Sequence, residues 1–543
     1  MRALLAYAAI SAPDTMVGVG SLDFRVTLDD TASELARSLG RTAAKLPRLE
    51  ALHQLTSLYA ALLPERYRGS AGAFYTPPCL AERLLDQAQA AGLDWTTARI
   101  LDPAAGGGVF LVHAATRMLA ALGKCEPKFA LKQIKNRLRG LELDPCAAAL
   151  AQVSMELVLA DIIEAAGDEA PLFVRVCDTL EEPSKATYDL VVSNPPYGRV
   201  TLTEDARKRY GRSLYGHANL YGVFTDIALR WTKPGGLIAY LTPTSFLAGQ
   251  YYSALRGLLA KDAPPVTIDF VHARRGVFED VLQETLLAVY RKGASPARAQ
   301  IHYLIVTSEL TAEATRNGTV GLPSPATRPW LAPRSPEHSR LIAAVEAAPD
   351  RLASWGYSVS TGPLVWNRHK KQLRQRAGKG THPLVWAEAV TPNGRFVHQA
   401  KKKNHAPFFK VEEGDAWLVV REPCVLVQRT TAKEQARRLI AAEMPSVFVN
   451  RHSGVVVENH LNMVRAAGKP IVKPKILAAL LNSDVADQIF RCMSGSVAVS
   501  AFELEAMPLP PPNALETLAR LVSGKADRAK IEAECRRLYE VTE

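Results

Sequence analysis

The stretch that decides how this chain folds is Tyr188-Asp189-Leu190-Val191-Val192, followed by Ser193-Asn194-Pro195-Pro196-Tyr197-Gly198. Its first half is a short apolar run, which is typical of a buried parallel strand. The two prolines fix φ and remove two backbone donors, so we expect a stiff loop after the strand. Asn194 precedes a proline and is held extended, with its side-chain carbonyl directed outward. Together with the main-chain carbonyls and the flat face of Tyr197, it forms a cradle for an amino group on an aromatic ring; a simple tight turn is the alternative.

Short apolar runs and helix-like segments alternate on both sides of this stretch. Strands are expected at residues 99–101, 138–143, 173–176, 190–192, 237–241, 267–271 and 286–290, and helices at 80–91, 109–122, 146–160 and 223–231. This alternation predicts an α/β fold in which helices cover both faces of a parallel sheet. Such sheets bind ligands at the carboxyl ends of their strands, so the polar residues that follow the strands are the candidate site residues.

A glycine-rich turn leaves the first of these strands and opens a helix. It reads Asp102-Pro103-Ala104-Ala105-Gly106-Gly107-Gly108. Small residues let the backbone approach a ligand closely, and the start of a helix presents free N–H groups. The turn lacks the spacing of the nicotinamide-binding motif, and its acidic first residue suits an ammonium group better than a pyrophosphate. It therefore favours S-adenosylmethionine over NAD, although a plain strand–helix connection can look the same.

Two further acidic residues come directly after expected strands. Glu142 can accept hydrogen bonds from both hydroxyls of a ribose. Asp144 is the alternative for this role, but Asp144-Pro145 is also a good start for a helix. Asp178 follows the third strand and can accept from the amino group of an adenine, or can cap the strand end instead. Their order along the chain predicts a nucleoside-binding edge that leads to Asn194.

Length and composition limit the class of protein. The chain has 543 residues, of which 48% are hydrophobic and 22% charged, so we expect two or three folded domains rather than a disordered chain. Its formal net charge of +12 favours a polyanionic partner. The seven cysteines are scattered without a CxxC pair, which predicts neither a metal site nor disulfides and fits a reducing cytoplasm. No run reaches the roughly 18 apolar residues of a membrane span, so we expect a soluble cytoplasmic protein.

The composition and the pattern of apolar residues change along the chain and suggest five segments. They are a helical lead-in at 1–70, a catalytic domain at 71–295, a proline-rich connector at 296–345, a recognition domain at 346–512 and a C-terminal helix at 513–543. The lead-in repeats leucines at helical spacing, which we interpret as a packing face. Basic residues cluster with aromatic ones in the recognition domain, which favours a surface that follows phosphates.

The order of the motifs resembles the gamma-class N6-adenine DNA methyltransferases of type II restriction–modification systems. An element Gly72-Ala73-Phe74-Tyr75-Thr76-Pro77-Pro78 precedes the glycine turn, and Asn-Pro-Pro-Tyr follows at 194–197. The resemblance implies a Rossmann-like class I methyltransferase domain with a mostly parallel seven-stranded sheet, followed by a mixed α/β target-recognition domain. It also implies S-adenosylmethionine as the cofactor, bound by Phe74, Tyr75, Thr76, Pro77, Asp102, Ala104, Gly106, Gly108, Glu142, Leu143, Asp178 and Thr179.

A base inside duplex DNA cannot reach a methyl donor buried at a strand end, so we expect it to be flipped out before it is methylated. By the resemblance, the catalytic residues are Asn194, Pro195, Pro196, Tyr197 and Phe278. The Asn194 amide and the Pro195 carbonyl would accept hydrogen bonds from the base amine, and Tyr197 and Phe278 would stack on the two faces of the base. Asn194 favours adenine; cytosine N4, RNA or protein-glutamine methylation and a catalytically silent DNA-binding module are the alternatives.

The expected partner is double-stranded DNA. Candidate DNA contacts are Arg368, Lys370, Lys371, Arg429, Thr430, Thr431, Lys433, Arg437, Arg438 and Asn462. Arginine is among the residue types that read the edges of bases. One chain carries both the catalytic and the recognition part, so we expect a monomer. No nuclease pattern stands out, which favours a methylase partnered by a separate endonuclease.

Overall fold

The computed structural model describes residues 2–11, 29–63, 76–273, 284–346, 348–430, 437–495 and 498–539. The predicted site residues Phe74, Tyr75, Phe278, Thr431 and Lys433 lie outside these ranges. The chain divides into two compact units. The first comprises residues 1–246 and 251–322, and the second comprises residues 247–250 and 323–543.

A nine-stranded sheet organises the first unit. In spatial order its strands are β11 (Thr311–Val320), β10 (Ala299–Ser308), β8 (Pro265–Ala273), β9 (Thr285–Arg291), β7 (Thr232–Pro243), β4 (Tyr188–Ser193), β1 (Ile100–Asp102), β2 (Leu138–Glu142) and β3 (Val174–Val176). All pairs from β7 to β3 and the pair β8–β10 are parallel, whereas β9 is antiparallel to both neighbours and β11 is antiparallel to β10. The prediction of a mostly parallel α/β sheet is confirmed, with two strands more than the seven expected.

The two additional strands, β10 and β11, occupy part of the segment predicted as a connector. Ile301, Leu304 and Val306 of β10 are buried, and β10 pairs in parallel with β8. The connector prediction is therefore wrong for residues 299–320. The clustered prolines that directed the prediction toward a connector begin at Pro323, beyond β11, and residues 299–320 contain none.

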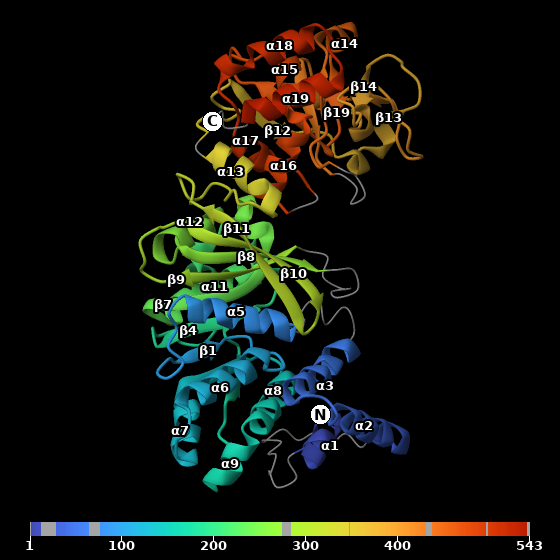
Figure 1. The fold of residues 1–543 in the computed structure, drawn as a ribbon. Coiled ribbons are helices and arrows are strands. Elements are labelled where there is room, and N and C mark those ends of the chain that lie inside the picture. Colours follow the sequence, from blue (N-terminus) through green and yellow to red (C-terminus); the bar gives the residue numbers. More distant parts are fainter. Residues whose placement is uncertain are drawn as a thin grey trace. The chain divides into compact units, whose positions relative to one another are not determined.

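Helices cover both faces of this sheet (Figure 1). On one face, α5 (Pro78–Ala90), α6 (Val109–Leu122) and α8 (Pro145–Val158) share the main hydrophobic core with Ala239 and Val289. The next residues along the same strands, Tyr240 and Tyr290, point to the opposite face, where they meet α11 (Leu220–Trp231) and α12 (Ser253–Asp262). The connection from β3 to β4, which the structure describes throughout, contains no helix.

The N-terminal segment is helical in the residues that the structure describes. It forms α1 (Arg2–Ser11), α2 (Asp30–Ala43) and α3 (Arg48–Leu62). Leu52 and Leu55 of α3 are buried against Leu150 and Val153 of α8, so the leucine repeat is a packing face, as predicted. The remaining elements of the unit are α7 (Pro127–Arg137), α9 (Ala160–Ala166), α10 (Glu204–Arg209), β5 (Arg199–Val200) and β6 (Ala218–Asn219). No single helix in the described part of the chain has the length and apolar character of a membrane span, although the bent pair α8–α9 passes that test.

The second unit is mixed α/β, as predicted, and its two sheets have the orders β12-β20-β17-β18 and β13-β15-β14-β19-β16. The strands are β12 (Tyr357–Thr361), β13 (Leu373–Arg374), β14 (Thr381–Val385), β15 (Phe408–Lys410), β16 (Val419–Val420), β17 (Cys424–Gln428), β18 (Ala441–Met444), β19 (Val455–Val457) and β20 (Leu461–Ala466). The helices are α13 (Ser339–Glu346), α14 (Ser446–Arg451), α15 (Pro474–Leu481), α16 (Asp484–Met493), α17 (Ala501–Ala506), α18 (Glu516–Ser523) and α19 (Arg528–Tyr539). One core joins Ile342, Leu518 and Tyr539, so the end of the predicted connector and the predicted C-terminal helix belong to this unit.

Candidate active site

The parallel strands end at one edge of the sheet, and a pocket opens there. β1, β2 and β4 end at Asp102, Glu142 and Ser193. The pocket is lined by His53, Thr56, Thr76, Ala104, Ala105, Gly106, Gly107, Val109, Phe110 and Asn194. The volume that the centre of a water-sized molecule can occupy in this pocket is about 30 Å³. The total empty volume, which includes the part open to solvent, is about 350 Å³. The glycine turn and the loop that begins at Asn194 therefore face one pocket.

The glycine turn has a backbone that only glycine adopts easily. Gly106 and Gly108 have φ angles of 52° and 87°, in the left-handed region that side chains disfavour. A Cβ at Gly108 would lie 3.0 Å from the Cα of Ala151, so glycine lets α6 and α8 pack closely. The N–H of Ala105 donates to the Leu141 carbonyl (2.9 Å), and this bond ties the turn to β2.

Glu142 bridges the glycine turn and the turn after β2. Its Oε2 accepts a hydrogen bond from the Gly106 N–H (2.7 Å), and its Oε1 accepts one from the Asp144 N–H (2.9 Å). Burial raises the pKa of Glu142. Each carboxylate oxygen has further lone pairs for donors such as the hydroxyls of a ribose. The adjacent Leu143 is 67% exposed, which leaves an apolar surface beside the carboxylate for a flat ring.

Asp144, the alternative ribose ligand, has other partners. Its Oδ1 accepts from the Cys146 N–H (2.8 Å) and caps α8, and its Oδ2 accepts from the hydroxyl of Tyr59 (2.7 Å). The helix start predicted at Asp144-Pro145 is therefore confirmed. Because Asp144 serves the helix and α3, Glu142 is the better candidate for the ribose.

The sequence suggested that Asp102 faces the ligand, but the structure does not place it in the lining of the pocket. It is 0% exposed. Its Oδ1 accepts from the Ser193 hydroxyl (2.8 Å) and from the Ala104 N–H (3.1 Å), so it joins the end of β1 to the end of β4. Burial raises the pKa of Asp102 to about 7, against the effect of these two hydrogen bonds. The carboxylate thus holds two loops together rather than meeting the ammonium group of a ligand.

The two predicted residues after β3 differ in exposure. Asp178 is exposed, and its Oδ1 accepts from the Leu180 N–H (2.9 Å), which is the capping role that the sequence left open. Thr179 is buried, and its hydroxyl donates to the Pro103 carbonyl (2.7 Å). Asp178 can therefore still meet a ligand at this edge, whereas the Thr179 side chain supports the glycine turn.

Asn194 lies half-buried in the pocket wall, directly after β4. Its Nδ2 donates to the Thr76 hydroxyl (3.1 Å), and its Oδ1 accepts from the Tyr197 hydroxyl (2.7 Å). Thr76 is buried and comes two residues before α5. The element that precedes the glycine turn in the sequence and the loop after β4 therefore touch, and their hydrogen bonds orient the carboxamide.

Tyr197 belongs to an aromatic cluster. Its hydroxyl also approaches the Leu241 carbonyl of β7 (3.3 Å). Its ring meets Tyr221 edge-on, with centroids 6.1 Å apart, and Tyr221 stacks on Tyr252 at 5.1 Å. Burial raises the pKa of Tyr197, so the phenol is a neutral donor. Sequence reasoning missed Tyr221 and Tyr252 because neither lies in a motif.

Comparisons with known proteins find similarity to type II methyltransferases. A family model described as Eco57I restriction-modification methylase matches residues 136–278. The type II methyltransferase M.BsuBI of Bacillus subtilis is 26% identical over 437 residues, which cover 78% of this chain and 85% of that protein. M.PstI of Providencia stuartii is 25% identical over 448 residues, which cover 80% and 86%. These matches support a gamma-class type II methyltransferase of a restriction–modification system.

Among solved structures, that of the type IIL restriction-modification enzyme MmeI in complex with DNA aligns with a TM-score of 0.57 at 12% identity, covering 99% of this chain and 86% of that one. At this identity the likeness concerns the fold alone. The methyltransferase acts on DNA and uses S-adenosylmethionine as its cofactor. The strand ends fit this cofactor, because Leu143 offers an apolar surface for its adenine, Glu142 offers acceptors for its ribose and the glycine turn offers closely approachable backbone.

Some of the predicted DNA contacts of the methyltransferase lie on the surface of its second unit. Arg368, Lys370 and Lys371 are exposed, and the Nζ of Lys370 lies 5.6 Å from the centroid of the Trp366 ring. Thr430 is exposed, and Arg429 and Arg438 are half-buried. These side chains stay candidates for contact with DNA.

Two other predicted DNA contacts, one buried and one half-buried, donate to main-chain carbonyls of the second unit. Asn462 is 0% exposed in β20, and its Nδ2 donates to the Val499 carbonyl (2.8 Å), so the prediction that it contacts DNA is wrong. The guanidinium of Arg437 donates to the carbonyls of Asn482 and Pro392. Arg437 therefore holds main-chain segments together, and we no longer expect it to reach DNA.

His53 and Thr56 line the pocket of the methyltransferase, although no sequence motif marked them. Both come from α3, within the segment interpreted as a packing face. His53 falls between the leucines of that face, and this position is the one signal that could have identified it. The N-terminal segment thus contributes to the site as well as to the core.

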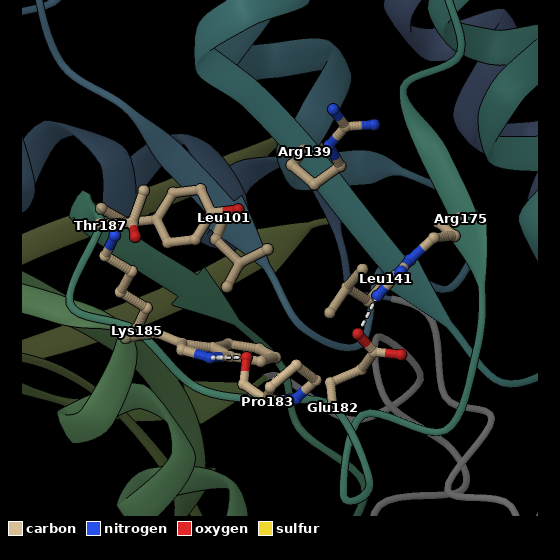
Figure 2. Close-up of a pocket in the computed structure, with 10 residues that line it drawn as sticks. Leu101, Arg139, Leu141, Arg175, Glu182, Pro183, Lys185 and Thr187 are labelled. Atoms are coloured by element: carbon tan, nitrogen blue, oxygen red, sulfur yellow. Dashed lines mark hydrogen bonds and ion pairs between the residues drawn. The ribbon is translucent and has the colours of Figure 1, made fainter.

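A second cavity lies on the opposite face of the sheet from α6 and α8, and it has about 380 Å³ of room for water-sized molecules. It exists because no helix covers the connection from β3 to β4. Figure 2 shows Arg139, Leu141 and Arg175 of neighbouring strands lining it, with Arg175 paired to Glu182. None of the residues predicted to bind the cofactor lines this cavity, so the smaller pocket is the candidate methyl-transfer site.

Proposed function

We propose that this DNA methyltransferase modifies the exocyclic N6 amine of adenine at a specific site in double-stranded DNA. The observation that carries the proposal is the position of the Asn194 carboxamide. It follows β4, is bonded to Thr76 and Tyr197, and lies in the wall of the pocket that the glycine turn also lines. An acceptor for the base amine would therefore stand next to the methyl donor.

When bound, S-adenosylmethionine supplies a sulfonium methyl group, which the lone pair of adenine N6 attacks while the S–CH₃ bond breaks. The amine of adenine is a weak nucleophile because its lone pair is delocalised into the ring. Hydrogen bonds from its N–H groups to Asn194 and to the Pro195 carbonyl would favour a pyramidal nitrogen and free that lone pair. N6 releases a proton to water after the transfer, so no strong base is needed. In-line placement of the two reactants supplies most of the catalysis.

Asn194 can serve the base without releasing Tyr197. A side-chain carbonyl has two lone pairs, and the Tyr197 hydroxyl occupies one of them at 2.7 Å. The second can accept an N–H group of the base. The same hydroxyl bond holds the Tyr197 ring beside Asn194, where the ring can stack on one face of the base. Pro196 keeps this loop rigid, and Phe278 remains our candidate for the other face.

The position of the acceptor supports base flipping. A base paired inside a duplex cannot reach an amide in a pocket wall at a strand end, so the adenine would have to leave the stack. The exposed cations of the second unit would bind phosphates. We assign phosphate or base contacts there to Arg368, Lys370, Lys371, Arg429, Thr430, Thr431, Lys433 and Arg438. We further propose that the enzyme acts as a monomer and that a separate endonuclease completes the system.

Transfer of tritium from methyl-labelled S-adenosylmethionine to plasmid DNA tests the proposal. The wild type should label the DNA, and Asn194→Ala should lose at least about a hundredfold in rate while still binding DNA and S-adenosylhomocysteine. Asn136→Ala is the matched control, because Asn136 is an exposed residue of α7, and it should keep the wild-type rate. A wild type that labels nothing, or an unchanged rate in Asn194→Ala, would contradict the proposal.

A further inference from the structure

The N-terminal helix α3 forms one wall of the cofactor pocket. His53 and Thr56, about one turn apart, both line it. The leucines of α3 pack on α8, and the Tyr59 hydroxyl donates to Asp144, the N-cap of α8 (2.7 Å). These contacts fix α3 at the edge of the sheet where β2 ends. One wall of the pocket is therefore formed by a segment that precedes every motif of the catalytic domain.

His53 is the one titratable side chain among the described residues that line this pocket. It is 7% exposed, and its Nε2 lies 3.5 Å from the Oε2 of Glu309 in the turn between β10 and β11. Burial lowers the pKa of His53, Glu309 raises it, and the neighbouring His113 lowers it. His113 belongs to α6, and its Nδ1 lies 2.5 Å from the Oε1 of Glu82 in α5.

The pocket lies on the amino-acid side of the proposed cofactor position. Glu142 and Leu143 would hold the ribose and the adenine ring at one end, and Asn194 marks the place of the methyl group. The rest of the cofactor then extends toward the glycine turn and α3. This end carries an ammonium group and a carboxylate. A carboxylate that leaves water needs a cation or several N–H donors to offset its lost hydration.

We propose that His53 binds the α-carboxylate of S-adenosylmethionine. The inference rests on the proposed position of the cofactor. The other side chains of the pocket wall carry no charge, and the Thr56 hydroxyl donates within α3 to the Leu52 carbonyl (2.8 Å). His53 is the group in the wall that can supply a positive charge, and Glu309 orients its ring. Val109 and Phe110 at the start of α6 also line the pocket, and their N–H groups would supply additional donors to the same carboxylate.

A proton should accompany the cofactor into the complex. The carboxylate would add a second anion beside His53, next to Glu309, and would raise the pKa of its imidazole. At a pH between the pKa values of the free and the bound enzyme, binding takes up a proton. The affinity for S-adenosylmethionine should therefore weaken as the pH rises through the interval that begins at the lowered pKa of His53 in the free enzyme and ends at its raised pKa in the complex.

Calorimetric titration with two ligands tests this inference. S-adenosylmethionine carries the carboxylate, and decarboxylated S-adenosylmethionine lacks that group alone. His53→Gln should weaken binding of the first between about tenfold and a hundredfold and leave binding of the second unchanged. His338→Gln is the matched control, because His338 is a partly buried histidine of the second unit that does not line the pocket, and this variant should bind both ligands as the wild type does. Repeating the titrations near pH 7 in buffers of different ionisation enthalpy should show proton uptake in the wild type that is absent in His53→Gln.

The outcomes separate this inference from the proposed function. If His53→Gln weakens the binding of both ligands equally, the histidine only shapes the pocket. If the binding of S-adenosylmethionine is unchanged, His53 does not contact the carboxylate. Either result overturns the inference and leaves the proposed function standing. A slower methyl transfer with unchanged affinity would place His53 in proton removal and would also overturn it. A wild type that binds neither ligand would overturn both.

Discussion

In the first unit, the polar side chains at the strand ends are bonded to the main chain of neighbouring loops. Glu142 holds the Gly106 and Asp144 N–H groups, and Asp102 holds that of Ala104. In the second unit, Arg368, Lys370 and Lys371 are exposed, and Lys370 lies over the Trp366 ring. The first arrangement is a coupled network in which one change disturbs several loops. The second is a set of surface charges, and each phosphate that they neutralise should add a similar step to the salt dependence of DNA binding.

The largest change in stability is expected from Asp102→Asn, and its sign depends on pH. Burial raises the pKa of Asp102 in the folded protein to about 7, from an ordinary value of 3.8. The folded state thus binds this proton more tightly than the unfolded chain, so the stabilising contribution is present at low pH and is lost as the pH rises from about 4 to about 7. Asparagine does not ionise, so at about pH 8 the variant should exceed the wild type by at most about 4 kcal/mol in the free energy of unfolding.

Urea unfolding of both proteins across this pH range measures the difference, which should vanish near pH 4. Parallel stability curves would show that Asp102 titrates normally in the folded state. Calorimetry on the same variant should find its affinity for S-adenosylmethionine within a few-fold of the wild type, because Asp102 does not reach the pocket. A loss of a hundredfold would instead restore the contact between Asp102 and the ammonium group.

Glu142→Ala should weaken binding of S-adenosylmethionine by about a hundredfold. It removes the acceptor of two loop N–H groups and, in our proposal, the acceptor of the ribose hydroxyls, each charge-assisted bond being worth roughly 1.5–3 kcal/mol. Calorimetric titration gives the affinity, with Glu164→Ala, a change at an exposed residue of α9, as the control. An unchanged affinity would move the ribose to another side chain.

Lys370→Ala and Lys371→Ala should each weaken DNA binding by only a few-fold. Each should also reduce the slope of log affinity against log salt concentration by about one, and the double variant should show the sum of the two effects. Fluorescence anisotropy with a labelled duplex at several salt concentrations measures both quantities. A double variant that loses far more than this sum would show that the surface is as coupled as the strand-end network.

Asn462→Ala separates stability from DNA contact in the second unit. The side chain is buried and donates to the Val499 carbonyl, so its loss should cost about 1–2 kcal/mol of unfolding free energy. The salt slope of DNA binding should stay at the wild-type value. If that slope changes while the stability does not, Asn462 contacts DNA after all.

The contrast between the strand ends of the first unit and the surface of the second unit explains which site residues could be predicted from the sequence. A residue that follows a strand is placed by the topology of a parallel sheet, so Glu142, Asp178 and Asn194 could be predicted at one edge from their order alone. The side chain's own partners could not be predicted, because Asp102 turns inward to Ser193 and Ala104 through tertiary contacts. The sequence gives no comparable guide to a surface charge, and a polar residue such as Asn462 can equally well satisfy a buried carbonyl.

Two features of the first unit escaped prediction because distant segments create them. The strand β10 pairs with β8, a partner about 30 residues earlier in the chain, and the proline-rich residues from 323 on gave the surrounding segment the composition of a linker. His53 reaches the pocket through the packing of α3 on α8. In both cases the local sequence pattern fitted a simpler prediction, a connector for one and a packing face for the other. A contact with a distant segment determined the actual structure.

The identity of the methylated nucleoside tests the role of Asn194 most directly. DNA treated with the enzyme and S-adenosylmethionine would be digested to nucleosides and analysed by liquid chromatography and mass spectrometry. We predict N6-methyladenine from the wild type and none from Asn194→Ala. N4-methylcytosine as the product, or N6-methyladenine from both proteins in equal amounts, would contradict the proposed role of this carboxamide.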